Sequence, residues 1–310
     1  MTTFPSLCST FRRHAGRLLA AAMLAIAGTQ AVAAGLVIGS KNFTEQQLLS
    51  ELTAQYLGHK GFQVSQKGDL ATVIMRGALE SRQLDLVWDY TGTALIVYNK
   101  INERMTPEQA YDTVRRIDAD KGLTWLNASA LNNTYAFAMQ RQRAEREGIR
   151  TLSDLVAKMN AIALADPSAA WHLGLDMEFA GRPDGLKPLQ ALYKLPLTRP
   201  QIRQMDPGLV YTAIRDGFVP AGLVYTTDGR VKGFDMVVLE DDLGFFPSYA
   251  ATPVVRAEVL AQHPGLADAL NTLSAALDNE AMSTMNARVD IEHLPVRTVA
   301  ADFLRQRGLI

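Results

Sequence analysis

The chain has 310 residues, of which 48% are hydrophobic and 20% are charged, and its formal net charge is −1. These are the values of an ordinary globular protein, with enough length for one large domain or two medium ones. The near balance of basic and acidic residues argues against the strongly basic surface of a nucleic-acid-binding protein.

The N-terminal segment 1–34 has the pattern of a secretory signal peptide. A stretch with three arginines and no acidic residue precedes an apolar run of 11 residues at 18–28. That run is too short to span a bilayer comfortably, and the small residues at 31–34 then offer a cleavage site of the A-x-A type. An uncleaved membrane anchor is the alternative interpretation.

The remainder, from about Gly35, is predicted to be a soluble protein of the bacterial periplasm. Cys8 is the only cysteine, and it precedes the apolar run, whereas a lipoprotein cysteine would follow it. Without residues 1–34 the chain keeps 28 basic and 32 acidic residues, a formal charge of −4. Neither a disulfide nor a lipid is expected, so stability must come from core packing.

Strand-like and helical patterns alternate through the first part of the chain. Short apolar runs at 36–41 and 84–90 predict strands. Between them, residues 44–61 carry apolar side chains at helical spacing, and residues 71–83 return to a helical pattern. This alternation predicts an α/β unit with a mainly parallel sheet.

The rest of the chain repeats the alternation with different lengths. After a helix at 106–122, the sequence predicts further strands and helices. The expected strands are 132–140, 161–166, 221–227, 235–241 and 249–255, and the expected helices are 151–158, 171–181, 207–216 and almost all of 256–307.

Two lobes are predicted, and no Pro/Ser-rich linker separates them. The polypeptide would therefore cross between the lobes more than once, near Thr134 and Thr226. Residues 35–133 and 229–310 would then form a discontinuous first lobe, and residues 134–228 the second. A two-lobed α/β protein of this kind, with two hinge crossings, binds its ligand in the cleft at the carboxyl ends of strands.

No catalytic or metal-binding motif is found. The sequence lacks G-x-S-x-G, H-E-x-x-H, a Walker motif and G-x-G-x-x-G. Its histidines beyond residue 34 do not have the spacing of metal ligands, and adjacent acids such as Asp241 and Asp242 are typical of a solvated turn. We therefore expect no enzymatic activity, no cofactor and no metal.

Four of the nine tyrosines lie at the end of a predicted strand or in the loop beside it, where an α/β sheet presents side chains to a cleft. The other five lie in helical surroundings, where half-buried packing is the simpler interpretation. A quaternary ammonium group cannot donate a hydrogen bond, but aromatic ring faces attract it, each by ~0.5–2 kcal/mol once water is excluded. The four strand-end tyrosines are Tyr90, Tyr135, Tyr225 and Tyr249.

A zwitterionic ligand would also need partners for its anionic group. Lys41 and Arg182 are the candidate cations, with Thr93 and Asn133 as polar neighbours. A solvated loop lysine and a charge near a helix end are the simpler interpretations of the two cations. On their own, these residues do not identify a site.

Five separated motifs resemble those of the substrate-binding proteins of ABC importers for glycine betaine, choline and carnitine. The resemblance extends from about residue 36 to 305 and implies the type II periplasmic-binding-protein fold, in which two α/β lobes close on the ligand by a hinge. In chain order the motifs are IGSKNFTEQ, DLVWDYTGTAL, NNTYAFAM, RPDG and VYTTDGRVKGFDMVVLEDDLGFFPSY.

By motif match, the resemblance implies a box of four tyrosines around a trimethylammonium group. It also implies carboxylate contacts from Lys41, Thr93 and Arg182, with Asn133 where relatives often carry Asp or Asn. The box residues are Tyr90, Tyr135, Tyr225 and Tyr249. The sequence departs from the family pattern at FFPSY, where FFPPY is commoner, and near Trp171 and His172, so the identity of the ligand stays open.

The implied function is capture of a quaternary ammonium solute and its delivery, by a monomer, to a membrane permease driven by a cytoplasmic ATPase. Another osmolyte or cation, such as ergothioneine, proline betaine or an ectoine-like solute, is an alternative ligand. An enzyme of the porphobilinogen-deaminase type is a second alternative, but it would hold its cofactor on a cysteine that this chain lacks beyond Cys8. A regulator's effector domain would need a DNA-binding segment where the signal peptide stands.

Overall fold

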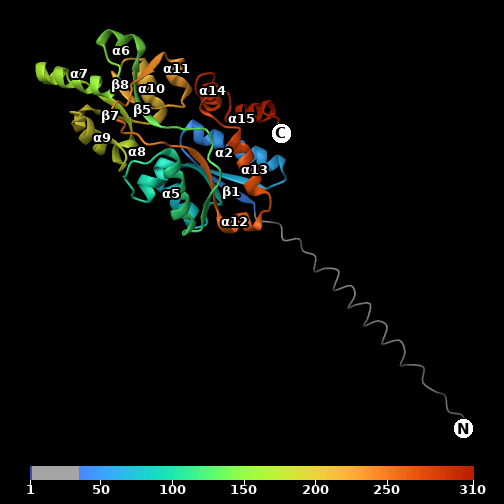
Figure 1. Ribbon diagram of the computed structural model, residues 1–310. Coiled ribbons are helices and arrows are strands. Elements are labelled where there is room, and N and C mark those ends of the chain that lie inside the picture. Colours follow the sequence, from blue (N-terminus) through green and yellow to red (C-terminus); the bar gives the residue numbers. More distant parts are fainter. Residues whose placement is uncertain (2–34) are drawn as a thin grey trace. The chain divides into compact units, whose positions relative to one another are not determined.

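The structure is a computed structural model that describes residue 1 and residues 35–310 (Figure 1). Apart from Met1, the predicted signal peptide therefore lies outside the described residues. Residues 35–310 contain two five-stranded sheets, each packed against helices, as expected for a two-lobed α/β protein. Among the described residues, no helix combines the length and the hydropathy needed to cross a bilayer.

The first sheet has the strand order β2-β1-β3-β10-β4. Its first three strands run parallel, and β10 lies antiparallel between β3 and β4. The sheet is therefore mixed. Its strands are β1 (Leu36–Lys41), β2 (Val64–Leu70), β3 (Leu86–Tyr90), β4 (Leu123–Trp125) and β10 (Ala251–Arg256).

Helices cover both faces of the first sheet, so its central strand β3 is buried at every position. Leu86 faces a core shared with the N-terminal and C-terminal helices, whereas Val87 faces a second core beneath two other helices. The first group, whose members lie side by side in Figure 1, consists of α2 (Thr44–His59), α13 (Leu266–Ala275), α14 (Asn279–Asp290) and α15 (Val296–Gln306); the second consists of α3 (Thr72–Glu80) and α5 (Pro107–Ala119).

The second sheet has the order β7-β6-β8-β5-β9. Strands β7, β6 and β8 are parallel, and β5 is antiparallel to both of its neighbours. Its strands are β5 (Tyr135–Gln140), β6 (Leu173–Asp176), β7 (Ile202–Met205), β8 (Ala221–Tyr225) and β9 (Met236–Val238), with α7 (Leu152–Ala165) and α9 (Leu186–Tyr193) on one face and α10 (Pro207–Arg215) on the other.

Two predicted elements of the second lobe are wrong. Of residues 161–166, expected as a strand, 161–165 continue helix α7, whose start is fixed by a capping box between Thr151 and Asp154, and Asp166 is its C-cap. The expected helix at 171–181 begins with the buried strand β6, and only the short helix α8 (Met177–Gly181) follows it. In both places a short apolar run fits a strand and a buried helix equally well.

The second crossing between the sheets comes later than Thr226. Strand β9 pairs with β5, with Ala138 opposite Val238, so the block 229–310 includes a strand of the second sheet. The chain returns to the first sheet between β9 and β10. The apolar run at 235–241 predicts a strand, but an edge strand of three residues carries no signal for the sheet that it joins.

Candidate ligand-binding site

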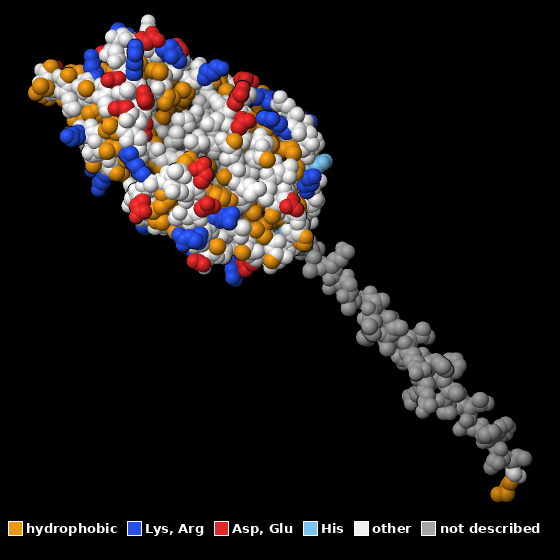
Figure 2. Space-filling view, in the orientation of Figure 1, with side chains coloured by type: hydrophobic (Ala, Val, Ile, Leu, Met, Phe, Trp, Pro, Cys, Tyr) orange, Lys and Arg blue, Asp and Glu red, His pale blue; other side chains and the backbone are white. Residues whose placement is uncertain are grey.

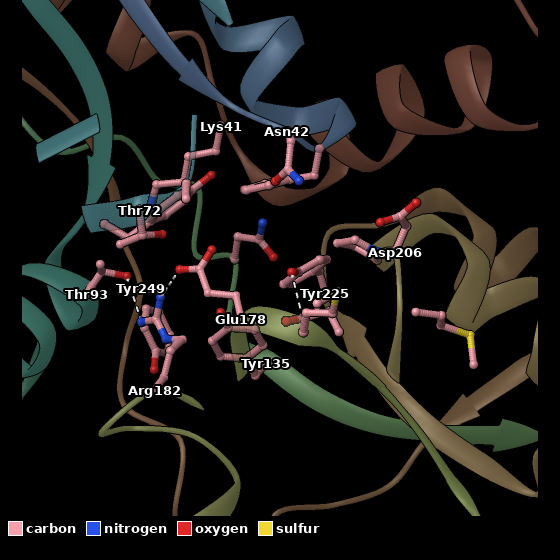
Figure 3. Close-up of a pocket in the computed structure, with 18 residues that line it drawn as sticks. Lys41, Asn42, Thr72, Thr93, Tyr135, Glu178, Arg182, Asp206, Tyr225 and Tyr249 are labelled. Carbon is pink, nitrogen blue, oxygen red and sulfur yellow. Dashed lines mark hydrogen bonds and ion pairs between the residues drawn. The ribbon is translucent and has the colours of Figure 1, made fainter. Parts of the chain in front are cut away.

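A cavity of about 360 Å³ is lined by residues from both lobes. Figure 3 shows Lys41 and Asn42 on one side of it, opposite Tyr135 and Tyr225. The structure brings all eight residues singled out in the sequence to this one cavity. They are Lys41, Tyr90, Thr93, Asn133, Tyr135, Arg182, Tyr225 and Tyr249.

The four tyrosines converge because of where their strands end. Tyr90 is the last residue of β3 and Tyr225 the last residue of β8, so each stands at the carboxyl end of a central strand. Tyr135 opens the antiparallel strand β5 and pairs directly with Tyr225. Tyr249 lies two residues before β10, whose first residue, Ala251, pairs with Tyr90.

A fifth aromatic residue, Phe43, joins the tyrosines. Its ring centroid lies 5.3 Å from that of Tyr225 and 6.5 Å from that of Tyr90, and both pairs are stacked. The centroid of Tyr135 lies 5.4 Å from that of Tyr225 and 5.5 Å from that of Tyr249. We call these five residues the aromatic cluster; Phe43 escaped sequence reasoning because it sits in a polar loop before α2.

Three of the four tyrosines donate their hydroxyl hydrogen bond to a buried carboxylate. Burial raises the pKa of all four phenols, so they stay protonated and keep these donors at neutral pH. The bonds are Tyr90 to Glu45 at 2.7 Å, Tyr225 to Asp176 at 3.1 Å and Tyr249 to Asp184 at 2.8 Å.

Arg182 enters the cavity from the end of α8 and is held by acids. Its Nε and Nη2 donate to the two carboxylate oxygens of Asp184 at 2.7 and 2.6 Å, and Nη1 donates to Glu178 at 3.1 Å. Nη2 also reaches Thr93 Oγ1 at 3.3 Å, and the guanidinium lies 5.5 Å from the centroid of the Tyr135 ring. Burial alone would lower the pKa of Arg182, but Asp184 outweighs it and raises the pKa.

Lys41 is buried rather than solvated. It is the last residue of β1, its side chain is only 5% exposed, and its Nζ lies 3.2 Å from Asp89 Oδ1. The same Nζ lies 5.1 Å from the centroid of the Tyr90 ring. Both predicted cations therefore already have an acidic partner, and a ligand carboxylate would have to share them.

Asn133 connects the aromatic cluster to the segment that crosses between the sheets. Its Nδ2 donates to Glu45 Oε1 at 2.9 Å, and its backbone N–H donates to the Tyr249 carbonyl at 3.2 Å. Its Oδ1 is buried and receives no hydrogen bond from residues 35–310. An acceptor of this kind can receive the polarised C–H groups of a ligand.

Three acidic residues of the cavity wall were missed in the sequence. Asp176 ends β6, Glu178 belongs to α8, and Asp206 follows β7. The signal for Asp176 was its position at a strand end, but it was hidden because 171–181 was expected to be helical. No group of His, Cys, Asp or Glu within the described residues has the arrangement of a metal site.

The family model that matches the chain is OpuAC, the substrate binding domain of ABC-type glycine betaine transport systems, over residues 34–306. A glycine-betaine-binding protein of Pseudomonas aeruginosa is 47% identical over 300 residues, which cover 95% of this chain and 96% of that protein. The glycine betaine-binding protein YehZ of Escherichia coli is 31% identical over 280 residues, which cover 87% of this chain and 90% of YehZ.

A crystal structure of a glycine betaine/carnitine/choline ABC transporter protein superimposes with a TM-score of 0.71 at 27% identity. The alignment covers 88% of this chain and 99% of that one, so the two-lobed fold of the periplasmic binding proteins is confirmed. The chain belongs to the family of substrate-binding components of glycine betaine ABC transport systems.

Proposed function

We propose that the protein captures a quaternary ammonium solute of the glycine betaine, choline or carnitine class in the cavity described above. The observation that carries the proposal is the convergence of Tyr90, Tyr135, Tyr225 and Tyr249, from both lobes, on one cavity. Four ring faces plus methyl burial supply about half of the ~8 kcal/mol that micromolar affinity requires.

The carboxylate of a zwitterionic ligand would lie toward Lys41, Thr93 and Arg182. Lys41 and Arg182 are both buried and charged, and Thr93 adds a hydroxyl that already contacts Arg182. Because both cations also serve buried acids, their contribution to carboxylate binding is smaller than that of free cations. The relative that is 47% identical is named for glycine betaine, which supports a zwitterionic solute of this size.

Closure of the lobes would complete the binding step. Tyr90 and Lys41 come from the first sheet, and Tyr135, Arg182 and Tyr225 come from the second lobe. Bringing these walls together removes water from the ring faces and lowers the local dielectric, so every electrostatic contact strengthens. The protein itself makes or breaks no covalent bond in this cycle.

The closed form would deliver its ligand, as a monomer in the periplasm, to a membrane permease driven by a cytoplasmic ATPase. The transport family and the signal-peptide pattern of residues 1–34 support this role. Figure 2 shows basic and acidic side chains interspersed over the displayed face, without an extended area of one sign. That pattern does not favour a nucleic-acid partner.

A thermal-shift panel on the purified protein tests the proposal. It would contain choline, glycine betaine, carnitine, proline betaine, ergothioneine and an ectoine. A ligand at about 100 times its Kd stabilises the folded state by ~2.7 kcal/mol, which corresponds to a rise in Tm of about 5–10 °C for a protein of this size. If the ectoine raises Tm and none of the quaternary ammonium compounds does, the proposed ligand class is wrong and an ectoine-like solute takes its place.

A further inference from the structure

Two buried carboxylates beside the aromatic cluster form no ion pair with any of the residues 35–310. Glu45 is 2% exposed and Asp176 is 3% exposed. Neither forms an ion pair within the part of the chain that the structure describes, although other buried acids there, such as Asp89 and Asp184, do. A buried carboxylate without a counter-charge is costly, so these two positions require an explanation.

Glu45 is surrounded by hydrogen-bond donors from three separate parts of the chain. Its Oε1 accepts from the Tyr90 hydroxyl at 2.7 Å and from Asn133 Nδ2 at 2.9 Å, and its Oε2 accepts from the Thr227 hydroxyl at 2.6 Å. Tyr90 in turn accepts from Gln46 Nε2 at 3.0 Å. This network satisfies the ionised form of Glu45, because a protonated carboxyl would present a donor to groups that already donate.

Asp176 occupies the equivalent place in the second lobe. Its Oδ2 accepts from the Tyr225 hydroxyl at 3.1 Å, and its Oδ1 accepts from the backbone N–H of Phe179 at 2.6 Å. The nearby Arg182 is engaged by Asp184 and Glu178 instead. Burial raises the pKa of both Glu45 and Asp176, as expected of acids that lack a cationic partner.

Glu45 therefore stands behind one wall of the cavity, and Asp176, which itself lines the cavity, stands beside the opposite one. Tyr90 ends the central strand β3 and Tyr225 ends the central strand β8, and the ring of Phe43 is stacked between them. A phenol that donates to a carboxylate makes a charge-assisted hydrogen bond and is polarised by it. Its ring then offers more electron density to a cation above its face.

We propose that Glu45 and Asp176 are positioning residues that act through Tyr90 and Tyr225, and that the onium charge of the ligand is the counter-charge which these two carboxylates lack. The inference rests on the proposed function, because it concerns the same cavity. It adds that recognition depends on negative charge held behind the Tyr90 ring and beside the Tyr225 ring, and not only on the ring faces and the fit of the methyl groups.

The test compares a cation with its neutral isostere. Choline and 3,3-dimethylbutan-1-ol differ in the replacement of the ammonium nitrogen by carbon, so the ratio of their Kd values reports the charge preference alone. We would measure both Kd values, by calorimetry or NMR titration, in the wild type, Glu45→Gln and Asp176→Asn. Each variant is expected to reduce the preference for choline at least ten-fold, while binding of the neutral alcohol changes less than three-fold.

Asp85→Asn is the matched control. Asp85 stands just before β3, at the opposite end of the strand from Tyr90; its side chain is 14% exposed, and it is paired with Arg256. Its replacement removes a largely buried carboxylate from the far end of the strand that carries Tyr90, and the preference for choline should stay within a factor of two of the wild type. Circular dichroism and Tm measurements establish that each variant is folded.

Other outcomes overturn the inference. An equal loss of affinity for both ligands in Glu45→Gln and Asp176→Asn would mean that the carboxylates only hold the tyrosines in place. Unchanged affinity in both variants would mean that neither acid contributes. If one variant does not fold, the other decides, since the two acids lie in different lobes. A wild type that binds no quaternary ammonium compound would refute the proposed function itself, and this inference with it.

Discussion

At the scale of single residues, the ring faces of the tyrosines and the methyl groups buried against them should account for about half of the binding free energy. Replacing Tyr90 or Tyr225 by Ala removes one wall of the cavity and leaves the buried acid behind it without its hydroxyl donor. We expect each substitution to weaken ligand binding at least ten-fold in calorimetric titration, because one ring contributes ~0.5–2 kcal/mol and each methyl-sized group that loses its burial against that ring costs about 0.8 kcal/mol more.

Tyr111 supplies the control for these substitutions. It is half-buried in α5 and donates its hydroxyl to the Leu126 carbonyl at 2.7 Å, and it does not line the cavity. Tyr111→Ala should lower Tm and leave the affinity unchanged. If Tyr90→Ala and Tyr225→Ala both bind ligand as tightly as the wild type, the aromatic cluster is not the binding site.

Much of the cavity could be predicted from single residues, since strand ends converge in an α/β sheet. Tyr90, Tyr135 and Tyr225 all lie at strand termini, where the local pattern reveals them. Phe43 and Glu45 could not be found in this way, because nothing in the sequence around the start of α2 indicates that they meet Tyr225 and Thr227 across the fold. Such contacts arise only from the packing of the two lobes.

At the scale of elements, the short helix α4 (Thr91–Thr93) approaches the segment before β10 so closely that only glycine fits at position 92. A Cβ added to Gly92 would lie 2.7 Å from the Ser248 carbonyl oxygen and 2.9 Å from the Tyr249 ring. Gly92→Ala should therefore push Tyr249 out of place and weaken ligand binding several-fold, with a fall in Tm.

Gly77 in α3 is the matched control, because an added Cβ there meets nothing within 4 Å. In this helix Gly77→Ala should stabilise the fold by about 0.5–1 kcal/mol without a change in affinity. Calorimetric titration and thermal unfolding of both variants make the comparison. Normal affinity in Gly92→Ala would show that the Tyr249 ring can move aside without consequence for binding.

A buried ion pair ties α3 to α5. Arg76 donates to both carboxylate oxygens of Asp118 at 2.6 and 2.8 Å, and Trp125 Nε1 donates to Asp118 at 2.9 Å. Burial alone would raise the pKa of Asp118, but the bonds from Arg76 outweigh it, and the pKa lies below its ordinary value. Asp118→Asn should therefore lower the free energy of unfolding by about 3–5 kcal/mol at neutral pH.

The pH dependence follows from the sign of this shift. An acid whose pKa is lower in the folded state contributes stability that is present above its unfolded pKa of ~3.9 and is lost as the pH falls through the folded value. The difference between the wild type and Asp118→Asn should thus be constant from pH 7 to about pH 5 and shrink below about pH 4. Urea unfolding at pH 7 and pH 3 tests this, and an equal difference at both values would contradict it.

Sequence patterns predicted some secondary-structure elements and failed for others. The buried strands β3 and β8 could be predicted because apolar runs of strand length precede a polar turn. Residues 161–166 could not be assigned, since an apolar run that continues a capped helix has the same composition as a buried strand. The place of β9 in the second sheet depends on its pairing with β5, which the local sequence pattern does not predict.

At the scale of the whole molecule, the cavity walls belong to two lobes, and the chain passes between these lobes twice. Hydrogen bonds from Arg182 to Thr93 and from Thr227 to Glu45 already join the two sides of the site. A ligand held by the aromatic cluster would contact both lobes at once. Its binding energy would then stabilise the lobes together, because neither can unfold without releasing it.

Differential scanning calorimetry tests this coupling. We expect a single unfolding transition whose Tm rises with ligand concentration, by about 5–10 °C at 100 times the Kd. In Tyr225→Ala the rise at the same ligand concentration should be much smaller, since the second lobe loses one of its two tyrosine rings at the cavity. Two separate transitions, one sensitive to ligand and one not, would instead place the ligand in a single lobe and contradict a site built from both.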